Sequence, residues 1–171
     1  GIQTRCCLCA RLTEAIIENY DAFKSELLTH SEILAVTAAR DLPNWRGPSI
    51  SLKDWEGKRD RSKFLIYYGS VDRDFIEAMR IELIEGISFA QDNTGRGLIV
   101  NQAAVAQMEM SDPLGRTISG WRHQGRIIGV VKDYYYNNMR ERLEPLVLKV
   151  STKDIRYLLA RISPNSPENA F

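Results

Sequence analysis

Hydrophobic and polar positions near the start of the chain follow two different periods. From Thr13 to Leu28 the apolar side chains recur at helical spacing, which predicts a helix with one buried stripe. Thr13 is the predicted N-cap, and Glu14 is favourable in the first turn. The stripe comprises Ile16, Ile17, Tyr20, Phe23, Leu27 and Leu28. Apolar runs at residues 6–12 and 33–37 predict a strand on each side of the helix, so the chain begins with a predicted β–α–β unit.

The rest of the chain alternates between short apolar runs and polar turns, a pattern typical of a sheet with several strands. The predicted strands cover residues 63–70, 81–89, 98–100, 117–118, 126–131, 146–151 and 156–163. The charged stretch around Glu56 to Asp60 predicts a hairpin or an exposed loop. Prolines and a glycine between Asp41 and Ser49 break the pattern and indicate a crossing between two parts of the fold.

Two short helices are predicted within this second part. Asp72 is the predicted N-cap of the first, and Asn101 is the predicted N-cap of the second, at residues 102–110. Their apolar faces comprise Phe75, Ile76 and Met79 in the first helix, and Ala104, Val105 and Met108 in the second.

Turn residues mark several further positions. The order Asp112, Pro113, Leu114, Gly115 predicts a type I turn. Gly86 is predicted to end or bend an extended piece, and Gly129 to allow close approach of another backbone. Asp133 is predicted to accept hydrogen bonds at the turn that follows it. The glycine-containing stretch at 92–97 predicts a surface loop. It lacks the Gly-Lys-Ser/Thr ending of a phosphate-binding loop, so ATP binding is not expected.

Composition narrows the function classes. The chain has 171 residues, of which 44% are hydrophobic and 26% charged, as in an ordinary globular protein. Its 23 basic and 22 acidic residues give a net charge of +1, which disfavours a general nucleic-acid binder. No apolar run approaches the ~18 residues of a membrane helix.

Cysteines occur only at Cys6, Cys7 and Cys9. Cys6 and Cys9 have the spacing of a redox pair or of half a zinc site. Residues three apart in a strand point to opposite faces and cannot hold one ion together, and no second pair follows. We therefore predict no metal and no cofactor.

Two features suggest alternative functions. Tyr134, Tyr135 and Tyr136 could form a surface for a partner, a sugar or a nucleic acid, although alternation along an extended chain leaves at most two rings on one face. His123 could serve a small hydrolase together with Asp133 or Asp112, but no nucleophile motif lies nearby. Packing is the commoner role of such tyrosines, and a loop position that of such a histidine.

Four blocks in this order resemble the extracytoplasmic core domain of MacB/FtsX-type ABC-transporter permeases. They are VDRDFIEAMRIELIEGISF, LIVNQAAVAQMEMSDPLGRTI, GRIIGVVKDYYYNNMRERLEPLVLKV and RYLLARI, and the resemblance extends roughly from Glu32 to Arg161. The residues that match the family's motif are Asp72, Gly86, Asn101, Asp112, Pro113, Gly115, Gly129, Asp133 and Pro145. As a set these motifs are specific, although none is specific alone.

The resemblance implies an α+β fold with two lobes, a split βαβ lobe and an inserted mixed α/β lobe. Residues 1–42 would form the first part of the βαβ lobe, 43–149 the inserted lobe, and 150–171 the start of the second part of the βαβ lobe, truncated here, which the family continues through a further helix and strand. Hinges are expected at Pro43–Pro48 and Leu143–Pro145. The resemblance also implies a non-enzymatic domain on the periplasmic or extracytoplasmic face of the inner membrane. There it would couple ATP-driven motion of a separate ATPase chain and dock a substrate or a partner protein.

Overall fold

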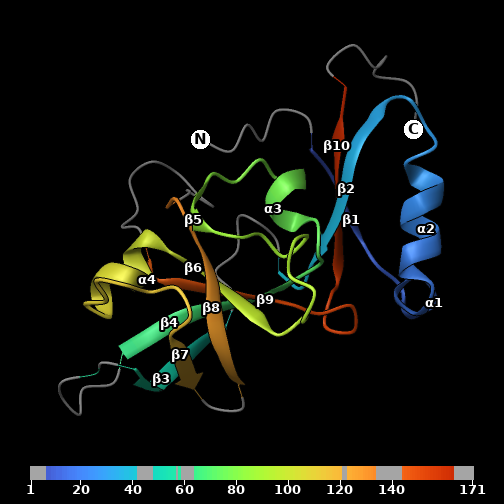
Figure 1. Ribbon diagram of the computed structural model, residues 1–171. Helices are drawn as coiled ribbons and strands as arrows, with labels where there is room; N and C mark the ends of the chain where they lie inside the picture. The colour runs from blue at the N-terminus through green and yellow to red at the C-terminus, as the bar shows by residue number, and fades with distance from the viewer. Residues whose placement is uncertain are drawn as a thin grey trace.

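The computed structural model describes residues 7–41, 48–56, 58, 64–120, 123–133 and 144–163. Within these ranges the chain is an α+β protein, which confirms the predicted class (Figure 1). The strands are β1 (Cys7–Arg11), β2 (Ile33–Ala39), β3 (Ser49–Trp55), β4 (Phe64–Val71), β5 (Leu83–Gly86), β6 (Gly97–Asn101), β7 (Thr117–Gly120), β8 (His123–Val131), β9 (Leu146–Val150) and β10 (Tyr157–Ile162). The helices are α1 (Glu14–Glu18), α2 (Tyr20–Leu27), α3 (Phe75–Ala78) and α4 (Gln102–Gln107). No helix among these residues is long and apolar enough to span a bilayer.

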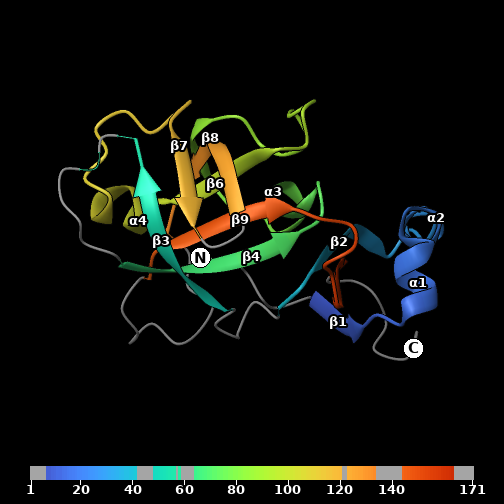
Figure 2. The ribbon, with the colours of Figure 1, turned by 90° about the horizontal axis from the view of Figure 1, so that it is seen from below.

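Strands β3, β4, β6, β7, β8 and β9 close on themselves and are here termed the ring. Their order is β4–β3–β7–β8–β6–β9, and parallel pairing of β9 with β4 closes the circuit (Figure 2). The pairs β3–β4, β3–β7, β7–β8 and β6–β9 are antiparallel, and β6–β8 is parallel. β5 pairs with the C-terminal end of β8, beyond the stretch that pairs with β7. Closure gives each ring strand a partner on both sides.

The interior of the ring is a hydrophobic core to which every ring strand contributes. Its buried members are Leu52, Trp55, Ile66, Tyr68, Leu98, Val100, Ala104, Met108, Ile118, Ile127, Val130 and Val147. Inward positions alternate along the strands, as in Leu98 and Val100, because neighbouring side chains of a strand point to opposite faces. Ala104 and Met108 belong to the α4 segment, so the predicted apolar face of that helix is confirmed as a packing surface.

Strands β1, β10 and β2 form a second unit, here termed the small sheet, against which α1 and α2 pack (Figure 1). β10 lies between β1 and β2 and is antiparallel to both, so β1 and β2 run parallel to each other. Five members of the predicted helical stripe pack on the buried face of this sheet: Ile16, Ile17, Tyr20, Phe23 and Leu27. The sixth, Leu28, is 45% exposed. The predicted single helix is divided at Asn19, whose φ of −117° and ψ of 29° are not helical.

The ring and the small sheet are joined by a backbone pair and by a shared core. Ala39 of β2 pairs with Val71 of β4, and this is the single residue pair in register between the two strands. Around it Ala39 and Leu159 of the small sheet lie in one apolar cluster with Ile99 and Leu148 of the ring. Phe75, Ile76 and Met79 complete this cluster, which confirms the predicted apolar face of the first short helix.

The second predicted crossing is misplaced. Pro145 lies at the start of β9 inside the ring, where its carbonyl accepts a hydrogen bond from the backbone N–H of Tyr67 at 2.9 Å. The chain passes from the ring to the small sheet at residues 151–156 instead. Because a proline at the first position of a strand need not donate to the ladder, Pro145 is compatible with strand pairing rather than a sign of a hinge. Of the first predicted crossing, residues 43–47 lie outside the described residues.

Candidate functional site at the junction of ring and small sheet

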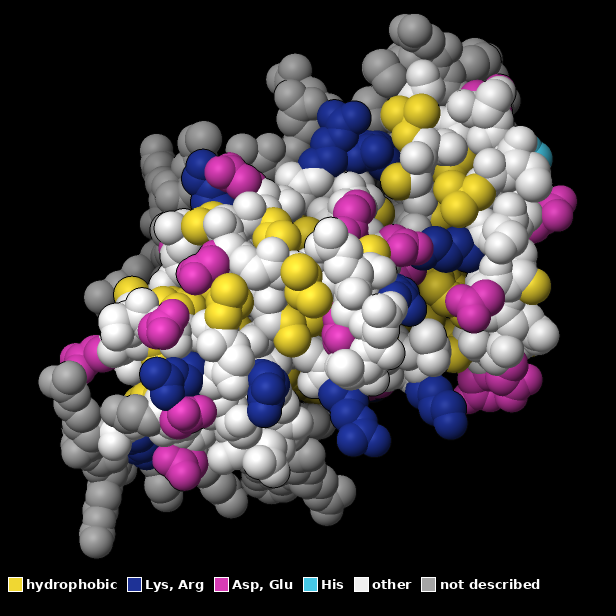
Figure 3. Space-filling view, viewed as in Figure 1, with side chains coloured by type: hydrophobic (Ala, Val, Ile, Leu, Met, Phe, Trp, Pro, Cys, Tyr) yellow, Lys and Arg dark blue, Asp and Glu magenta, His cyan; other side chains and the backbone are white. Residues whose placement is uncertain are grey.

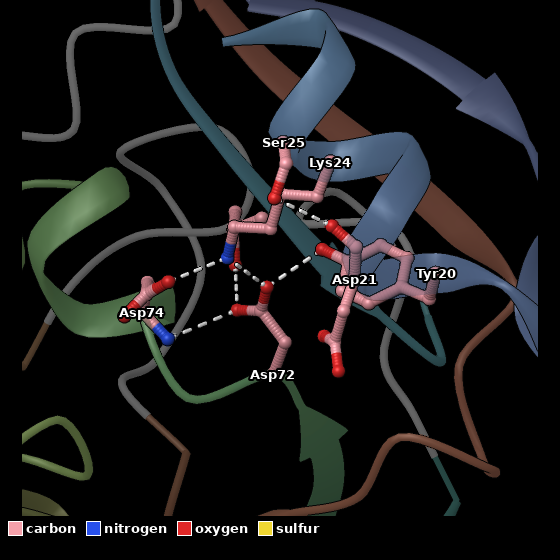
Figure 4. A network of polar contacts seen from close by, with 7 residues as sticks. Tyr20, Asp21, Lys24, Ser25, Asp72 and Asp74 are labelled. Atoms are coloured by element: carbon pink, nitrogen blue, oxygen red, sulfur yellow. Dashed lines mark hydrogen bonds and ion pairs between the residues drawn. The ribbon is translucent and has the colours of Figure 1, made fainter.

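A buried carboxylate occupies the junction. Asp72 follows β4 directly, and its backbone N–H donates to the carbonyl of Ala38 in β2 at 2.8 Å. The residue is 2% exposed. Figure 4 shows its carboxylate facing α2, where Oδ2 accepts from the Tyr20 hydroxyl at 2.6 Å and from Lys24 Nζ at 2.7 Å. Helix, sheet and ring therefore meet at one side chain.

The other carboxylate oxygen is also engaged. Oδ1 of Asp72 accepts from the Thr37 hydroxyl in β2 and from the backbone N–H of Asp74 at 3.2 Å. A buried carboxylate costs several kcal/mol unless it is paired and hydrogen-bonded. With four donors around it, Asp72 has the partners that make its burial tolerable. Each of those donors would lose an acceptor if the Asp72 carboxylate were removed.

Lys24 extends the cluster towards solvent. Its Nζ lies 2.6 Å from Oδ2 of Asp74, and its side chain is 12% exposed while that of Asp74 is 51% exposed. Burial lowers the pKa of Lys24, but the charge of Asp72 and the hydrogen bonds to Asp72 and Asp74 outweigh it, so the pKa lies above its usual value. Burial and the adjacent Asp72 carboxylate raise the pKa of Tyr20 far above its ordinary range.

These shifts decide what the cluster can do chemically. Tyr20 stays a neutral donor and Lys24 a cation at neutral pH, so neither can act as a general base there. The cluster is suited to holding elements together rather than to transferring protons. Among the described residues no group of His, Cys, Asp and Glu side chains could hold a metal ion.

A second polar cluster lines the return passage at residues 151–156. The Ser70 hydroxyl donates to Asp154 Oδ2 at 2.8 Å, and Arg40 Nη1 lies 3.4 Å from the same oxygen. Arg40 Nε lies 3.8 Å from Asp41 Oδ2. Burial raises the pKa of Asp41. The charges of Arg40 and Arg156 lower it and the charge of Asp154 raises it, so that the pKa lies above its usual value. Like the first cluster, this one lies where β2 and β4 end, and it joins them to the return passage, whereas the first joins them to α2.

Asp72 is not the N-cap that the sequence predicts. That position belongs to Asp74, with φ of −97° and ψ of 10° and no side-chain capping bond. The Asp72 side chain is instead drawn towards α2 and β2, because a lysine and two hydroxyls face it there. Helix propensity and capping patterns describe neighbours in sequence and cannot reveal partners that tertiary packing brings from far away.

Asn101, Asp133 and Pro145 come together at the start of α4. Asn101 Oδ1 accepts from the backbone N–H groups of Ala104 at 3.1 Å and Leu146 at 2.8 Å, so its predicted capping role is confirmed. Asp133 Oδ1 accepts from the backbone N–H of Ala103 at 2.9 Å, which makes it a second cap of α4. The turn after Asp133, where its bonds were expected, lies outside the described residues.

Gly86 and Gly129 face each other where β5 meets β8. Gly86 has φ of +83°, ends β5 and would place a Cβ 2.1 Å from the carbonyl oxygen of Ile128. A Cβ on Gly129 would lie 2.5 Å from the carbonyl oxygen of Ile87. Both predictions, of a strand end at Gly86 and of close backbone approach at Gly129, are confirmed.

The turn at Asp112, Pro113 and Gly115 closes one residue later than predicted. Its hydrogen bond runs from the Arg116 N–H to the Pro113 carbonyl at 3.2 Å, so Gly115, with φ of +78°, is the third residue. That position has positive φ in a type II turn, not a type I turn. The N–H of Gly115 instead donates to the Ile127 carbonyl, at 2.8 Å, which fixes the turn to β8.

The hydrolase alternative gains no support from the positions of its residues. His123 is the first residue of β8 and Asp133 lies beyond its last, and the strand between them, at about 3.3 Å per residue, spans roughly 26 Å. Asp112 is exposed, and the turn that it begins is bonded through the Gly115 N–H to Ile127, which lies roughly 13 Å along β8 from His123. Tyr134, Tyr135 and Tyr136 lie outside the described residues.

Sequence reasoning missed Tyr20, Lys24 and Thr37 as partners of Asp72. One signal was present: Lys24 lies four residues after Tyr20, so the two side chains project from the same side of the helix. A lysine beside an apolar stripe is drawn towards the interior, and its charge then needs a partner, because lysines are almost never fully buried unless paired. Nothing local indicates that Asp72, rather than another acid, is that partner.

Solved extracytoplasmic domains share this fold. The chain is similar to the periplasmic region of MacB from Actinobacillus actinomycetemcomitans, with a TM-score of 0.63 and 14% identity over 98% of this chain and 79% of that one. It is also similar to the extracellular domain of the noncanonic ABC-type transporter YknZ from Gram-positive bacteria, with a TM-score of 0.59 and 11% identity over 91% and 75% of the two chains. No family model and no curated protein matches the sequence. The resemblance predicted from the sequence blocks is therefore confirmed at the level of the fold.

Proposed function

We propose that this chain is the extracytoplasmic domain of an ABC-transporter permease, on the periplasmic or outer face of the membrane. The observation that carries the proposal is the likeness of fold to the periplasmic region of MacB over 98% of the chain. The sequence blocks support it independently, because Asp72, Gly86, Asn101 and Gly129 follow one another in the same order as the motif residues of the MacB/FtsX-type permease domains. Its partners would be a separate ATPase chain, reached through the membrane helices of the permease, and an exported substrate or partner protein.

As a coupler, the domain would consist of the two lobes implied by the sequence, with residues 1–42 and 150–171 in one and 43–149 in the other. The shared core and the Asp72 cluster favour lobes that move together, because relative motion would separate buried charges and apolar contacts. The domain would then transmit movement as one stiff body and would carry out no catalysis itself. Transmission by a stiff body replaces the hinge motion expected at Leu143–Pro145.

The location is tested on the full-length protein in intact cells. Cys6, Cys7 and Cys9 are changed to Ser, and Glu85→Cys places one thiol at an exposed position of β5. A membrane-impermeant maleimide should then label the protein without lysis, and the cysteine-free parent should remain unlabelled. Labelling that requires lysis would overturn the proposed location.

The stiff-body mechanism is tested by locking the junction. Ala39 and Val71 are cross-strand partners flanked by the bonds Arg40 N–H to Ser70 and Asp72 N–H to Ala38, the arrangement of a closely spaced antiparallel pair. Such a pair lies within the Cα range of disulfides. In the full-length transporter, oxidised Ala39→Cys/Val71→Cys should retain transport and ATPase stimulation. Activity that is lost on oxidation and restored by reduction would show that the junction must open.

A further inference from the structure

Two isoleucines are exposed where β5 meets β8. Ile84 is 47% and Ile87 is 40% exposed, although Ile84 belongs to a paired strand and Ile87 follows that strand directly. The N–H of Ile87 donates to the carbonyl of Ile128 at 2.9 Å, so the segment is held against β8. Both apolar side chains therefore stand on a fixed part of the surface.

Two partly buried side chains, Leu114 and Ile128, adjoin these isoleucines. A Cβ on Gly86 would lie 2.8 Å from Cδ2 of Leu114, so Leu114 covers the glycine between Ile84 and Ile87. The four apolar residues are here termed the β5 patch. Figure 3 shows hydrophobic side chains near the centre of the visible face, over β5 and the segment that follows it, with acidic side chains beside them. Contiguous exposed apolar surface of this kind marks interaction sites, unlike single exposed residues.

Two exposed carboxylates accompany the β5 patch. Glu85 lies between the isoleucines in sequence, and Asp112 lies two residues before Leu114. Neither carboxylate forms an ion pair with another described residue. The patch therefore combines apolar area with negative charge that is not neutralised within the described part of the chain.

The cations of the neighbouring strands are engaged elsewhere. Lys132 Nζ lies 2.8 Å from Oε2 of Glu82. Arg116 donates through Nε to the backbone carbonyl of Asp112 at 3.3 Å, but its Nη1 lies 2.6 Å from Oε1 of Glu56. The hydrogen bond from Arg116 lowers the pKa of Glu56, and the charge of Arg126 contributes to the same shift, so Arg126 also faces Glu56.

We infer that the β5 patch docks a segment of a partner protein in which apolar side chains stand next to lysine or arginine. The inference rests on the proposed function and deepens it, because it gives the docking surface a place and its partner a chemistry. Charge decides between the occupants: Glu85 and Asp112 would repel anionic lipid headgroups and nucleic acid, whereas they attract a basic side chain. Side chains as exposed as Ile84 and Ile87 do not enclose a small ligand.

The partner is held by its side chains rather than by an added strand. The register of β5 shifts between Leu83 and Glu85, and Gly86, with φ of +83°, ends the strand. Such irregularities protect a sheet edge from pairing with another chain. With few apolar residues in the patch, the interface lies at the small end of the range for protein complexes, which suits a partner that binds and leaves.

The test is photo-cross-linking in intact cells that make the full-length protein with p-benzoylphenylalanine in place of Ile84. Irradiation should cross-link this position to a protein, and mass spectrometry of the product should find a partner peptide with apolar residues beside Lys or Arg. The control carries the same photoreactive residue in place of Leu65 of β4, which is more exposed, at 64%. Position 65 should give no such product.

Matched charge reversals test the role of the two carboxylates. Glu85→Lys/Asp112→Lys should reduce cross-linking from position 84 by more than about tenfold, because like charges at an interface cost several kcal/mol. Glu18→Lys/Glu26→Lys makes the same change of net charge on α1 and α2 and should leave the yield unchanged.

Several results would overturn the inference: equal yields from positions 84 and 65, a product with lipid or with an exported substrate alone, an acidic partner peptide, or a yield that Glu85→Lys/Asp112→Lys does not lower. A charge-dependent product with a cytoplasmic protein would support the docking surface and refute the proposed function, so the two failures are distinguishable.

Discussion

The hydroxyl of Tyr20 donates to the carboxylate of Asp72 across 2.6 Å, although the two residues are 52 positions apart in the chain. Tyr20 is 4% and Asp72 2% exposed, so the bond lies inside the protein and not on its surface. It connects the first turn of α2 to the end of β4. The orientation of the helices therefore depends on a residue that belongs to the ring.

Asp72→Asn should destabilise the domain by about 3 kcal/mol, because it leaves the largely buried Lys24 cation without its inner partner. Urea unfolding followed by far-UV circular dichroism measures this loss. Glu82→Gln is the matched control: it removes an ion pair with Lys132 in which both side chains are more than half exposed. That change should cost less than ~0.5 kcal/mol. Equal effects of the two substitutions would show that burial of the Asp72 pair does not matter.

Stability should fall steeply in alkali because of Tyr20. Its pKa is raised in the folded protein, so its contribution is fully present below about pH 10 and is lost as pH rises above that value, where the unfolded tyrosine ionises. Unfolding free energies measured from pH 8 to about pH 11 should therefore decline less steeply in Tyr20→Phe than in the parent. A parallel decline in both proteins would contradict the assignment. Absorbance at the phenolate band should show Tyr20 ionising only as the protein unfolds.

Gly86→Ala should cost more than Gly95→Ala. Both glycines have positive φ, of +83° and +64°, so alanine is strained at either position. At Gly86 the added Cβ also meets the Ile128 carbonyl oxygen at 2.1 Å, whereas no atom lies within 4 Å of it at Gly95. We expect a loss of about 1 kcal/mol at Gly95 and about 3 kcal/mol at Gly86, measured by urea unfolding. A ranking in the other order would refute the close approach of β5 to β8.

Asn101→Ala should destabilise the ring by about 2 to 3 kcal/mol, because it leaves the N–H groups of Ala104 and Leu146 without their acceptor in a buried setting. Amide hydrogen exchange at Leu146 should accelerate more than at Ile127. Asn19→Ala is the control, since Asn19 is exposed and makes no side-chain cap. It should change stability by less than ~0.5 kcal/mol.

The elements could be read from local patterns, whereas their connections could not. The stripe from Ile16 to Leu27, the strand at 126–131 and the cap at Asn101 are all set by residues within a few positions of one another, and each was confirmed. The close approach of the Ile87 backbone to Gly129 was also indicated by the residue type alone.

Errors arose where distant residues decide the outcome. Asp72 was assigned to the helix beside it because Lys24 and Thr37 are far away in sequence. Pro145 was taken for a hinge because Tyr67, whose N–H donates to its carbonyl, lies in a different part of the chain. The division of the first helix at Asn19 is a smaller error of the same kind. Apolar spacing continues through that residue, and the break appears in the backbone angles alone.

The place of β10 between β1 and β2 sets a constraint on how the chain can fold during synthesis. The first two strands of the small sheet have no contact in register with each other, and each must wait for residues 157–162, which are made after both of them. The ring closes late too, since its seam pairs Tyr67 with Leu146. Pairings so distant in sequence carry a large loop-closure cost and form slowly. A nascent chain that stops short of residue 157 would thus expose the apolar faces of α1, α2 and β2 together, and would be a natural substrate for chaperones until β10 is made.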